Sequence, residues 1–392
     1  MYPQRLGLEL INLGDKVNHT IPRHERNLVV RIKKNDSLPS AGKHAILVDS
    51  IPAEIIKRAE FYCTSNVEIF DSLRGNNVPA VLLPPSLSHV DSGDIVRISS
   101  NDHYLRILFK KKHRQNAFLL TERCNNWCIM CSQPPKDIDD SYLVDDVLAA
   151  ISLLDESTPE IAFTGGEPSL LGDKLITLIS AAKNLLPRTA LHILSNGRNF
   201  SDETLARKVG DVKHPDLMLG IPLYADNAGD HNYVVQADAF EETIAGIMNL
   251  KRHGVKVEIR CVLHAATYER LPELAKYISR NLLFVDQVVL MGLEAMGFGK
   301  TNFNSLWVDP GLLVPKIEEA IGNLNRAKIR CSLYNLPLCI LGSLSQQHAV
   351  KSISDWKNEY LDGCHTCTKK NECCGFFSST KHHYVNMIKP FK

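Results

Sequence analysis

A regular alternation of strand and helix patterns constrains the fold of this chain more than any other feature. From about residue 116, short apolar and β-branched runs predict strands, and a helical stretch follows each of them. The predicted strands lie near residues 117–121, 160–164, 190–194, 216–223, 255–263 and 285–291, and the predicted helices near 143–154, 170–186, 202–208, 237–253, 270–281 and 311–327. Six successive units imply a parallel sheet with right-handed crossovers. Because a closed TIM barrel needs eight units, we expect a partial, open (β/α)6 barrel.

The chain of 392 residues is long enough for two or three domains. Short β-branched runs alternate with turn signals in residues 1–115, which predicts a small, mainly β or α+β domain with one helix near Ala53–Phe61. We assign residues 116–328 to the partial barrel and residues 329–392 to a cysteine-rich C-terminal region.

Composition limits the classes of function. A hydrophobic content of 44% with 23% charged residues is typical of a soluble globular protein. The net charge of +1 gives no basic field for a nucleic acid, and no run approaches the roughly 18 apolar residues that span a membrane. No export signal is recognisable at the N-terminus, so the eleven cysteines favour metal ligation over disulfides. We expect a protein of the reducing cytoplasm, with neither a nucleic-acid nor a membrane partner.

Unusual polar groups follow the predicted strands where those strands end. Ligands of β/α sheets bind beyond the C-terminal ends of the strands. In strand order, these groups are the cysteine loop 124–131, Thr164–Pro168, Ser195–Arg198, Tyr224–Asp226, Arg260 and Met291–Glu294. Their convergence on one edge predicts a single functional site.

Three cysteines in the first of these loops, Cys124, Cys128 and Cys131, have the spacing C-x3-C-x2-C. Thiolates are soft ligands that suit iron–sulfur clusters, zinc or copper(I). Three cysteines on a four-iron cluster leave one iron without a protein ligand, and an open position is what a metal needs for chemistry. Three buried cysteines, or three of four zinc ligands, are the alternative interpretations.

The spacing resembles the cluster-binding loop of the radical S-adenosylmethionine (SAM) superfamily. Gly165-Gly166-Glu167, which begins 34 residues after Cys131, resembles the GGE motif of that superfamily, where backbone and carboxylate oxygens accept from the amine of SAM. The resemblance implies a partial barrel and a 4Fe–4S cluster whose open iron binds SAM. An electron then cleaves SAM to methionine and a 5′-deoxyadenosyl radical, which abstracts a hydrogen atom from the substrate.

The same resemblance implies roles for further residues. Ser195 and Asn196 resemble the ribose-binding stretch after the third strand, with an ordinary turn as the alternative. Arg260 lies in a strand that should be buried on both faces, so it needs a partner, either the SAM carboxylate or a structural ion pair. Glu258 is expected to face elsewhere. Glu294, the candidate catalytic residue, is expected to contact the adenine or the substrate, or to pair with Arg260.

The fourth strand departs from the superfamily pattern. Residues 221–226 read Ile-Pro-Leu-Tyr-Ala-Asp where relatives often carry Ser-Leu-Asp. This departure puts any transferred contact at the fourth strand in doubt. Tyr224 and His231 are candidate site residues, and core packing is the alternative for each.

A second set of cysteines follows the barrel. Cys339, Cys364, Cys367 and either Cys373 or Cys374 are the expected ligands of an auxiliary 4Fe–4S cluster, with a zinc ribbon as the alternative. Cys331 lies in an apolar run and is expected to be structural.

A narrower resemblance covers nearly the whole chain. It is to the HxsC family of radical SAM maturases in the bacterial His-Xaa-Ser peptide-modification system. The tracts that carry it, besides the Cys124 loop, are Met291–Glu294, Tyr334–Cys339, Ser354–Asn358 and Cys373–Phe377. It implies a peptide or protein substrate with His-Xaa-Ser repeats, a second radical SAM maturase, a small accessory protein and an electron donor such as flavodoxin or ferredoxin. Two alternatives remain: a radical SAM enzyme acting on a small molecule in cofactor biosynthesis, and a non-catalytic scaffold that binds zinc or an iron–sulfur cluster.

Overall fold

A computed structural model of the chain describes residues 10–12, 27–34, 43–50, 59–99, 104–353 and 357–392. The chain divides into two compact units. One comprises residues 1–120, 141–162 and 180–190, and the other comprises residues 121–140, 163–179 and 191–392.

The N-terminal part of the first unit is built on a mixed seven-stranded sheet with the strand order β1-β7-β6-β2-β3-β4-β5. Its elements are β1 (Leu10–Asn12), β2 (Asn27–Lys34), β3 (His44–Leu47), β4 (Phe61–Thr64), α1 (Val67–Gly75), β5 (Ala80–Leu82), β6 (Ile95–Ser99) and β7 (Tyr104–Phe109). Strands β2 to β5 pair in parallel, and β6 and β7 pair antiparallel. The helix expected near Ala53–Phe61 falls mostly on residues outside the described part of the chain, and Phe61 itself begins β4.

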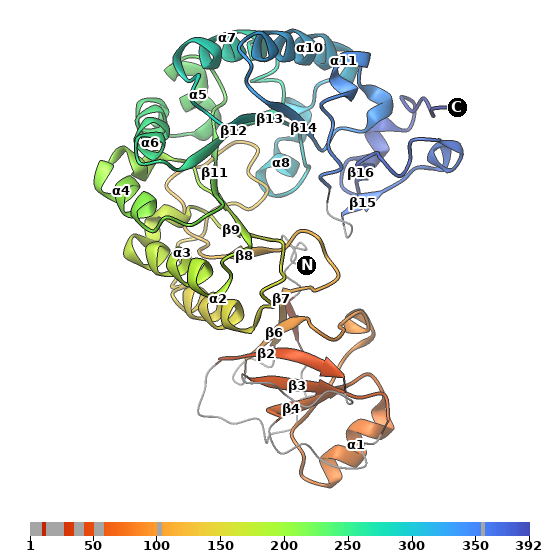
Figure 1. Cartoon of the computed structure of the whole chain (residues 1–392). Coiled ribbons are helices and arrows are strands. Elements are labelled where there is room, and N and C mark those ends of the chain that lie inside the picture. Colours follow the sequence, from red (N-terminus) through yellow and green to blue (C-terminus); the bar gives the residue numbers. More distant parts are fainter. Residues whose placement is uncertain (1–9, 13–26, 35–42, 51–58, 100–103, 354–356) are drawn as a thin grey trace. The chain divides into compact units, whose positions relative to one another are not determined.

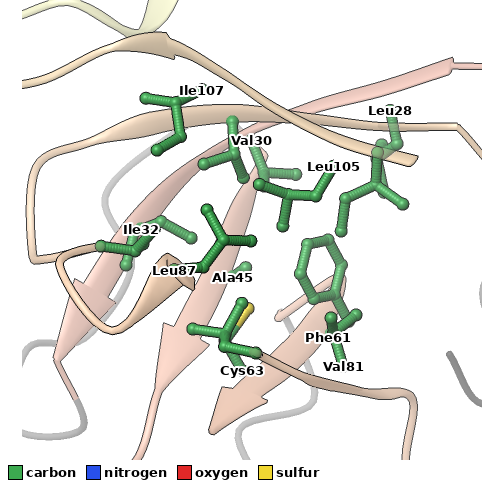
Figure 2. Packing of buried hydrophobic residues seen from close by; sticks show 14 residues of the cluster. Leu28, Val30, Ile32, Ala45, Phe61, Cys63, Val81, Leu87, Leu105 and Ile107 are labelled. Atoms are coloured by element: carbon green, nitrogen blue, oxygen red, sulfur yellow. The ribbon is translucent and has the colours of Figure 1, made fainter. Parts of the chain in front are cut away.

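Alternate residues of these strands form one buried core (Figure 2). Leu28, Val30 and Ile32 project from β2 at every second position, and Phe61 and Cys63 do so from β4. Because side chains alternate across a strand, this spacing directs a whole row of apolar groups to one face. Cys63 is fully buried and burial raises the pKa of its thiol, so it packs here as a small apolar residue.

The first unit also contains helix α2 (Tyr142–Leu153), which an ion pair ties to the N-terminal sheet. Arg97 of β6 lies opposite Arg106 of β7, and both are largely buried. Like charges opposite each other are unfavourable. The carboxylate of Asp146 on α2 offsets this repulsion, with 2.9 Å between Arg97 Nε and Asp146 Oδ2.

The second sheet has its seven strands side by side in sequence order. They are β8 (Ala117–Leu119), β9 (Glu160–Thr164), β10 (Ala190–Leu194), β11 (Leu217–Pro222), β12 (Lys256–Leu263), β13 (Gln287–Gly292) and β14 (Cys331–Tyr334). All pairs from β10 to β14 are parallel, and the sheet curls as an open half-barrel (Figure 1). The six predicted strands are confirmed as β8 to β13. A seventh strand was not predicted: the four-residue β14, which contains Cys331, extends the sheet beyond β13.

Helices separate the strands, and α4 to α7 and α10 lie along the outer side of the curled sheet (Figure 1). The predicted helices correspond to α2, α3 (Asp173–Leu185), α4 (Glu203–Asp211), α6 (Phe240–Arg252), α7 (Leu271–Asn281) and α10 (Pro310–Arg326). The sequence analysis missed α5 (Ala228–Val235), α8 (Gly297–Thr301), α9 (Phe303–Leu306) and α11 (Ser343–Gln346). These helices have at most eight residues, too few to show helical periodicity.

The C-terminal region has little regular structure. Strand β15 (Asn358–Glu359) pairs antiparallel with β16 (Phe376–Phe377) over two residues. Short 3-10 helices form at Leu338–Ile340, Asp362–Thr366 and Lys381–Tyr384. Across the described ranges, every helix is too short or too polar to cross a bilayer.

Candidate active site

The loop 124–131, which carries the cysteine triplet, follows β8 and is held by two helices that the sequence did not predict. The backbone N–H groups of Trp127 and Ile129 each donate to a carbonyl at the end of α5, at 3.0 Å. On the other side, Phe298 N of α8 donates to Cys131 O at 2.8 Å. These backbone bonds fix the loop without using a thiol.

The glycine pair after β9 touches the cysteine loop directly. A Cβ on Gly166 would lie 2.1 Å from Arg123 O and 3.0 Å from Cys124 Cβ, and a Cβ on Gly165 would lie 2.5 Å from Thr121 O. Neither glycine has a positive φ angle. These positions need glycine because two backbone segments approach each other closely.

The carboxylate of Glu167 joins the ends of two neighbouring strands. It is fully buried and accepts from Ser169 N at 2.8 Å, Ser195 Oγ at 2.7 Å and Asn196 N at 2.5 Å. Burial raises the pKa of Glu167, although these donors act to lower it. The carboxylate is therefore engaged by protein donors, and its contact with the amine of SAM stays a prediction.

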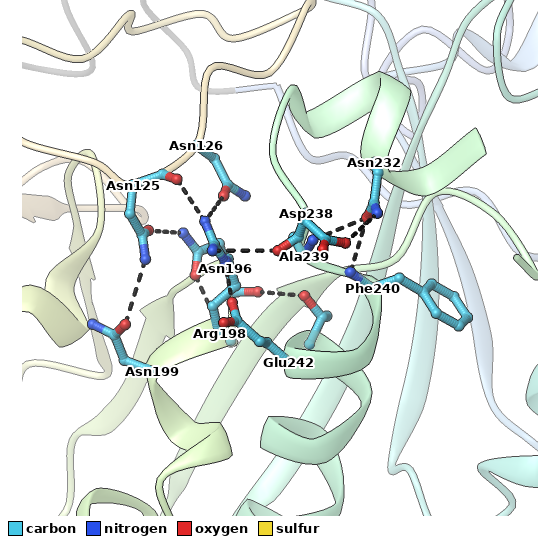
Figure 3. Close-up of polar contacts among 12 residues, drawn as sticks. Asn125, Asn126, Asn196, Arg198, Asn199, Asn232, Asp238, Ala239, Phe240 and Glu242 are labelled. Atoms are coloured by element: carbon cyan, nitrogen blue, oxygen red, sulfur yellow. Dashed lines mark hydrogen bonds and ion pairs between the residues drawn. The ribbon is translucent and has the colours of Figure 1, made fainter. Parts of the chain in front are cut away.

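The turn after β10 is bonded to the cysteine loop (Figure 3). Asn196 Nδ2 donates to Asn125 Oδ1 at 2.6 Å. Arg198 donates through Nη1 to Asn125 O at 2.6 Å and to Asn126 Oδ1 at 2.9 Å, while its Nε donates to Glu242 Oε2 at 2.6 Å. The sequence analysis assigned no role to Arg198 or to the two loop asparagines. The adjacent Asn125 and Asn126, between Cys124 and Cys128, were the sequence feature that could have indicated these contacts.

The three thiols are desolvated. Burial raises the pKa of Cys124 to about 11, and it also raises the pKa values of Cys128 and Cys131. Asn126 N donates to Cys124 Sγ at 3.4 Å, as backbone amides do to metal-bound thiolates. Within the described ranges, no three His, Cys, Asp or Glu side chains are arranged to hold a single metal ion. The fit to a cluster therefore rests on three soft donors, a rigid loop and an N–H group aimed at sulfur.

Two acidic residues have partners that differ from those expected. Glu258 was expected to face away from Arg260, but residues two apart on a strand share a face, and Glu258 Oε1 lies 3.2 Å from Arg260 Nε. Glu294 does not pair with Arg260, because its carboxylate lies 2.7 Å from Lys357 Nζ. The structural ion pair considered for Arg260 is thus present, with Glu258 as its acid.

The candidates after the fourth strand pack in the interior. His231 is 1% exposed, and its Nδ1 accepts from Tyr224 N at 3.3 Å. Burial lowers the pKa of His231 to about 4, so its imidazole is neutral at pH 7. It also makes an edge contact with the ring of Phe240. These contacts favour the packing interpretation for His231.

Residues 118–278 match the family model of the radical SAM superfamily. The sequence of this segment therefore resembles that of the radical SAM superfamily, whose members are enzymes that use a 4Fe–4S cluster and SAM. The cysteine loop and the glycine pair fall inside the matched residues.

Comparisons with other proteins cover parts of the chain. The pre-heme d1 synthase of Dinoroseobacter shibae is 29% identical over 186 residues, which is 47% of this chain and 44% of that protein. The Fe-coproporphyrin III synthase of Methanosarcina barkeri is 25% identical over 162 residues, 39% of this chain and 38% of that protein. The chain thus spans less than half the length of these relatives. The crystal structure of Streptococcus suis SuiB bound to precursor peptide SuiA superposes with a TM-score of 0.43 at 14% identity, covering 58% of this chain and 49% of that one.

Outside the radical SAM segment, four C-terminal cysteines line one pocket. They are Cys339, Cys364, Cys367 and Cys373, and the pocket is also lined by Tyr360, Lys369 and Phe391. Cys373 Sγ accepts from Leu338 N and Gly375 N, each at 3.4 Å. Cys374 packs instead in a separate apolar cluster with Ile353 and Phe377. Of the two alternatives for the fourth ligand, this arrangement favours Cys373.

If the C-terminal cysteines hold a metal, we expect Cys373→Ala to remove it and Cys374→Ala to retain it, because Cys373 lines the pocket and Cys374 does not. The measurement is the metal content after anaerobic reconstitution. Both variants are made in a chain that already carries Cys124→Ala, Cys128→Ala and Cys131→Ala, so that the first site contributes nothing. Equal losses, or a larger loss from Cys374→Ala, would contradict this ligand assignment.

Proposed function

We propose that the chain is a radical SAM peptide maturase, which cleaves SAM reductively to a 5′-deoxyadenosyl radical and modifies a peptide or protein with His-Xaa-Ser repeats. The observation that carries the cleavage activity is the contact between the cysteine loop and the glycine pair, where a Cβ on Gly166 would lie 2.1 Å from Arg123 O, directly before Cys124. This contact supports the proposal, because the two motifs that carry the resemblance to the superfamily touch each other.

The residues of the chain have separate tasks in this proposal. Cys124, Cys128 and Cys131 hold a 4Fe–4S cluster and leave one iron open for the amino and carboxylate groups of SAM. When bound, the cluster supplies the electron that cleaves SAM. The backbone at Gly165-Gly166-Glu167 accepts from the amine.

The remaining contacts to SAM and substrate come from other strand ends. Ser195 and Asn196 lie beside the ribose and Arg260 binds the SAM carboxylate. Glu294, which follows β13, contacts the substrate or the adenine. A closed pocket around these groups would exclude water and prevent side reactions of a radical.

The C-terminal pocket gives indirect support to the proposal of a peptide substrate. We propose that Cys339, Cys364, Cys367 and Cys373 hold an auxiliary 4Fe–4S cluster rather than zinc, and that this cluster binds the substrate or passes electrons. The narrower resemblance to HxsC maturases rests partly on the tracts around these cysteines. It extends to a second maturase, an accessory protein and a flavodoxin or ferredoxin as partners.

A second candidate is a radical SAM enzyme that acts on a small molecule. The observation that favours it is the set of curated relatives, whose names refer to heme d1, to an iron coproporphyrin and, in a GTP 3′,8-cyclase of Aliarcobacter butzleri that is 29% identical over 150 residues, to a nucleotide. Each relative aligns with less than half of this chain.

The two candidates differ in what dithionite-reduced, anaerobically reconstituted protein does with SAM and a peptide. We expect 5′-deoxyadenosine to form and the mass of a His-Xaa-Ser repeat peptide to change, while a control peptide with alanine in place of His and Ser stays unchanged. SAM cleavage that is indifferent to both peptides would favour the small-molecule candidate. A reconstituted protein that does not cleave SAM would refute both candidates.

A further inference from the structure

Strand β12 carries a carboxylate and a guanidinium on one face. Glu258 and Arg260 are two residues apart, so their side chains lie on the same side of the sheet. Glu258 is fully buried, and its Oε1 lies 3.2 Å from Arg260 Nε. A buried carboxylate is costly unless it is paired and bonded, so this position demands an explanation.

One side chain from a neighbouring strand bonds to the carboxylate of Glu258, and a second, two strands away, lies near it. Gln287 of β13 donates through Nε2 to Glu258 Oε2. His192 of β10 places Nε2 at 3.6 Å from Glu258 Oε1. Burial, helped by the charge of Arg260, lowers the pKa of His192 to about 3, so the imidazole is neutral at pH 7 and does not compete with Arg260 for the negative charge.

The stem of Arg260 follows a path that a glycine leaves open. Gly220 of β11 is paired with Glu258, and a Cβ on Gly220 would lie 2.9 Å from Arg260 Cδ and 3.0 Å from His192 Nε2. Any larger residue at position 220 would displace both side chains. The stem of Arg260 therefore occupies the space that the missing side chain of Gly220 leaves, and its Nε lies beside Glu258.

The outer edge of the same guanidinium is available. The side chain of Arg260 is 18% exposed, and neither Nη1 nor Nη2 has a hydrogen-bond partner among the residues that the structure describes. With Nε beside the carboxylate of Glu258, the guanidinium presents its two Nη groups as a fork, which matches the two oxygens of a ligand carboxylate.

We infer that Glu258 is a positioning residue, which orients Arg260 so that its Nη edge receives a ligand carboxylate. The identification of that ligand as SAM rests on the proposed function. The sequence left two alternatives for Arg260, a structural ion pair and a contact with the SAM carboxylate. Both can then occur together, because they use different nitrogens of the same guanidinium. Gln287 acts on Arg260 only through Glu258.

The substitution Glu258→Gln tests this role. The amide keeps an acceptor oxygen for Gln287 but removes the negative charge that lies 3.2 Å from Arg260 Nε. The matched control is Glu319→Gln on α10, whose side chain is 52% exposed and pairs with Lys276 at the surface. Binding of SAM and of decarboxylated SAM is measured by equilibrium dialysis on anaerobically reconstituted protein.

We expect Glu258→Gln to weaken SAM binding about tenfold, as loss of an outer partner of a ligating group does at metal sites, and to change decarboxylated SAM binding by less than about twofold. Glu319→Gln should change neither. Equal weakening of both ligands, or no weakening of either, would overturn the inference. Wild-type protein that does not bind SAM would instead refute the proposed function.

A second variant keeps the test decisive if Glu258→Gln does not fold. Gln287→Ala removes one anchor of Glu258 and leaves Arg260 and its ion pair intact. It should weaken SAM binding by a smaller factor, again without affecting decarboxylated SAM. If Gln287→Ala folds and binds both ligands as the wild type does, Glu258 does not position Arg260.

Discussion

Replacing Gly166 by alanine is expected to abolish both iron binding at the cysteine triplet and SAM cleavage. The added Cβ would lie 2.1 Å from Arg123 O and 3.0 Å from Cys124 Cβ, and real Cβ atoms do not approach backbone oxygens so closely. The backbone before Cys124 must therefore move, and the thiol moves with it. Iron content after reconstitution and 5′-deoxyadenosine formation are the two measurements.

A glycine in open space provides the matched control for Gly166→Ala. Gly322 lies inside helix α10, where the nearest atom to an added Cβ is Arg326 Nη1 at 3.9 Å. Gly322→Ala should stabilise the helix by up to about 1 kcal/mol and leave iron content unchanged. If Gly166→Ala binds as much iron as Gly322→Ala, the close approach does not position the cysteine loop.

Replacing Glu167 by alanine is expected to be the most destabilising of the single substitutions considered. Its carboxylate accepts from Ser169 N, Ser195 Oγ and Asn196 N, and all three donors would lose their acceptor in a buried place. Each unsatisfied buried donor costs about 1–3 kcal/mol, so the free energy of unfolding should fall by about 3 kcal/mol or more. Denaturant unfolding at pH 7 measures it.

The surface residue Glu319 again serves for comparison. Glu319→Ala removes an exposed ion pair with Lys276, and such pairs contribute at most about 1 kcal/mol. Because Glu167 joins the ends of β9 and β10, its replacement should also weaken SAM binding, which Glu319→Ala should not do. A Glu167→Ala protein as stable as Glu319→Ala would show that the carboxylate is not the link between these strands.

Much of the barrel and the centre of the site could be predicted from the sequence because both depend on local patterns. Each strand from β8 to β13 is a short apolar run between turn signals, and its bounds are confirmed to within about two residues. The cysteine spacing and the glycine pair are likewise motifs within a few residues. Strand β14 was not predicted, because its four residues, which begin at Cys331, do not differ from any other short apolar run.

The parts that could not be predicted depend on contacts between segments distant in the chain. Arg198 bonds to Asn126 across 72 positions, and α5 and α8 hold the cysteine loop through backbone atoms that leave no mark on the sequence. The direction of Glu258 required the register of β12 against β11 and β13. An apolar strand pattern does not say which buried polar residue faces which partner.

The central claim is that Cys124, Cys128 and Cys131 hold a catalytic 4Fe–4S cluster, and iron and sulfide per chain test it most directly. The measurement compares wild-type protein with the variant Cys124→Ala/Cys128→Ala/Cys131→Ala after anaerobic reconstitution. The account predicts about eight irons in the wild type and about four in the variant, as expected for two four-iron clusters of which one is lost. SAM cleavage should vanish with the first cluster. Zinc in place of iron, with no SAM cleavage by the wild type, would contradict the account.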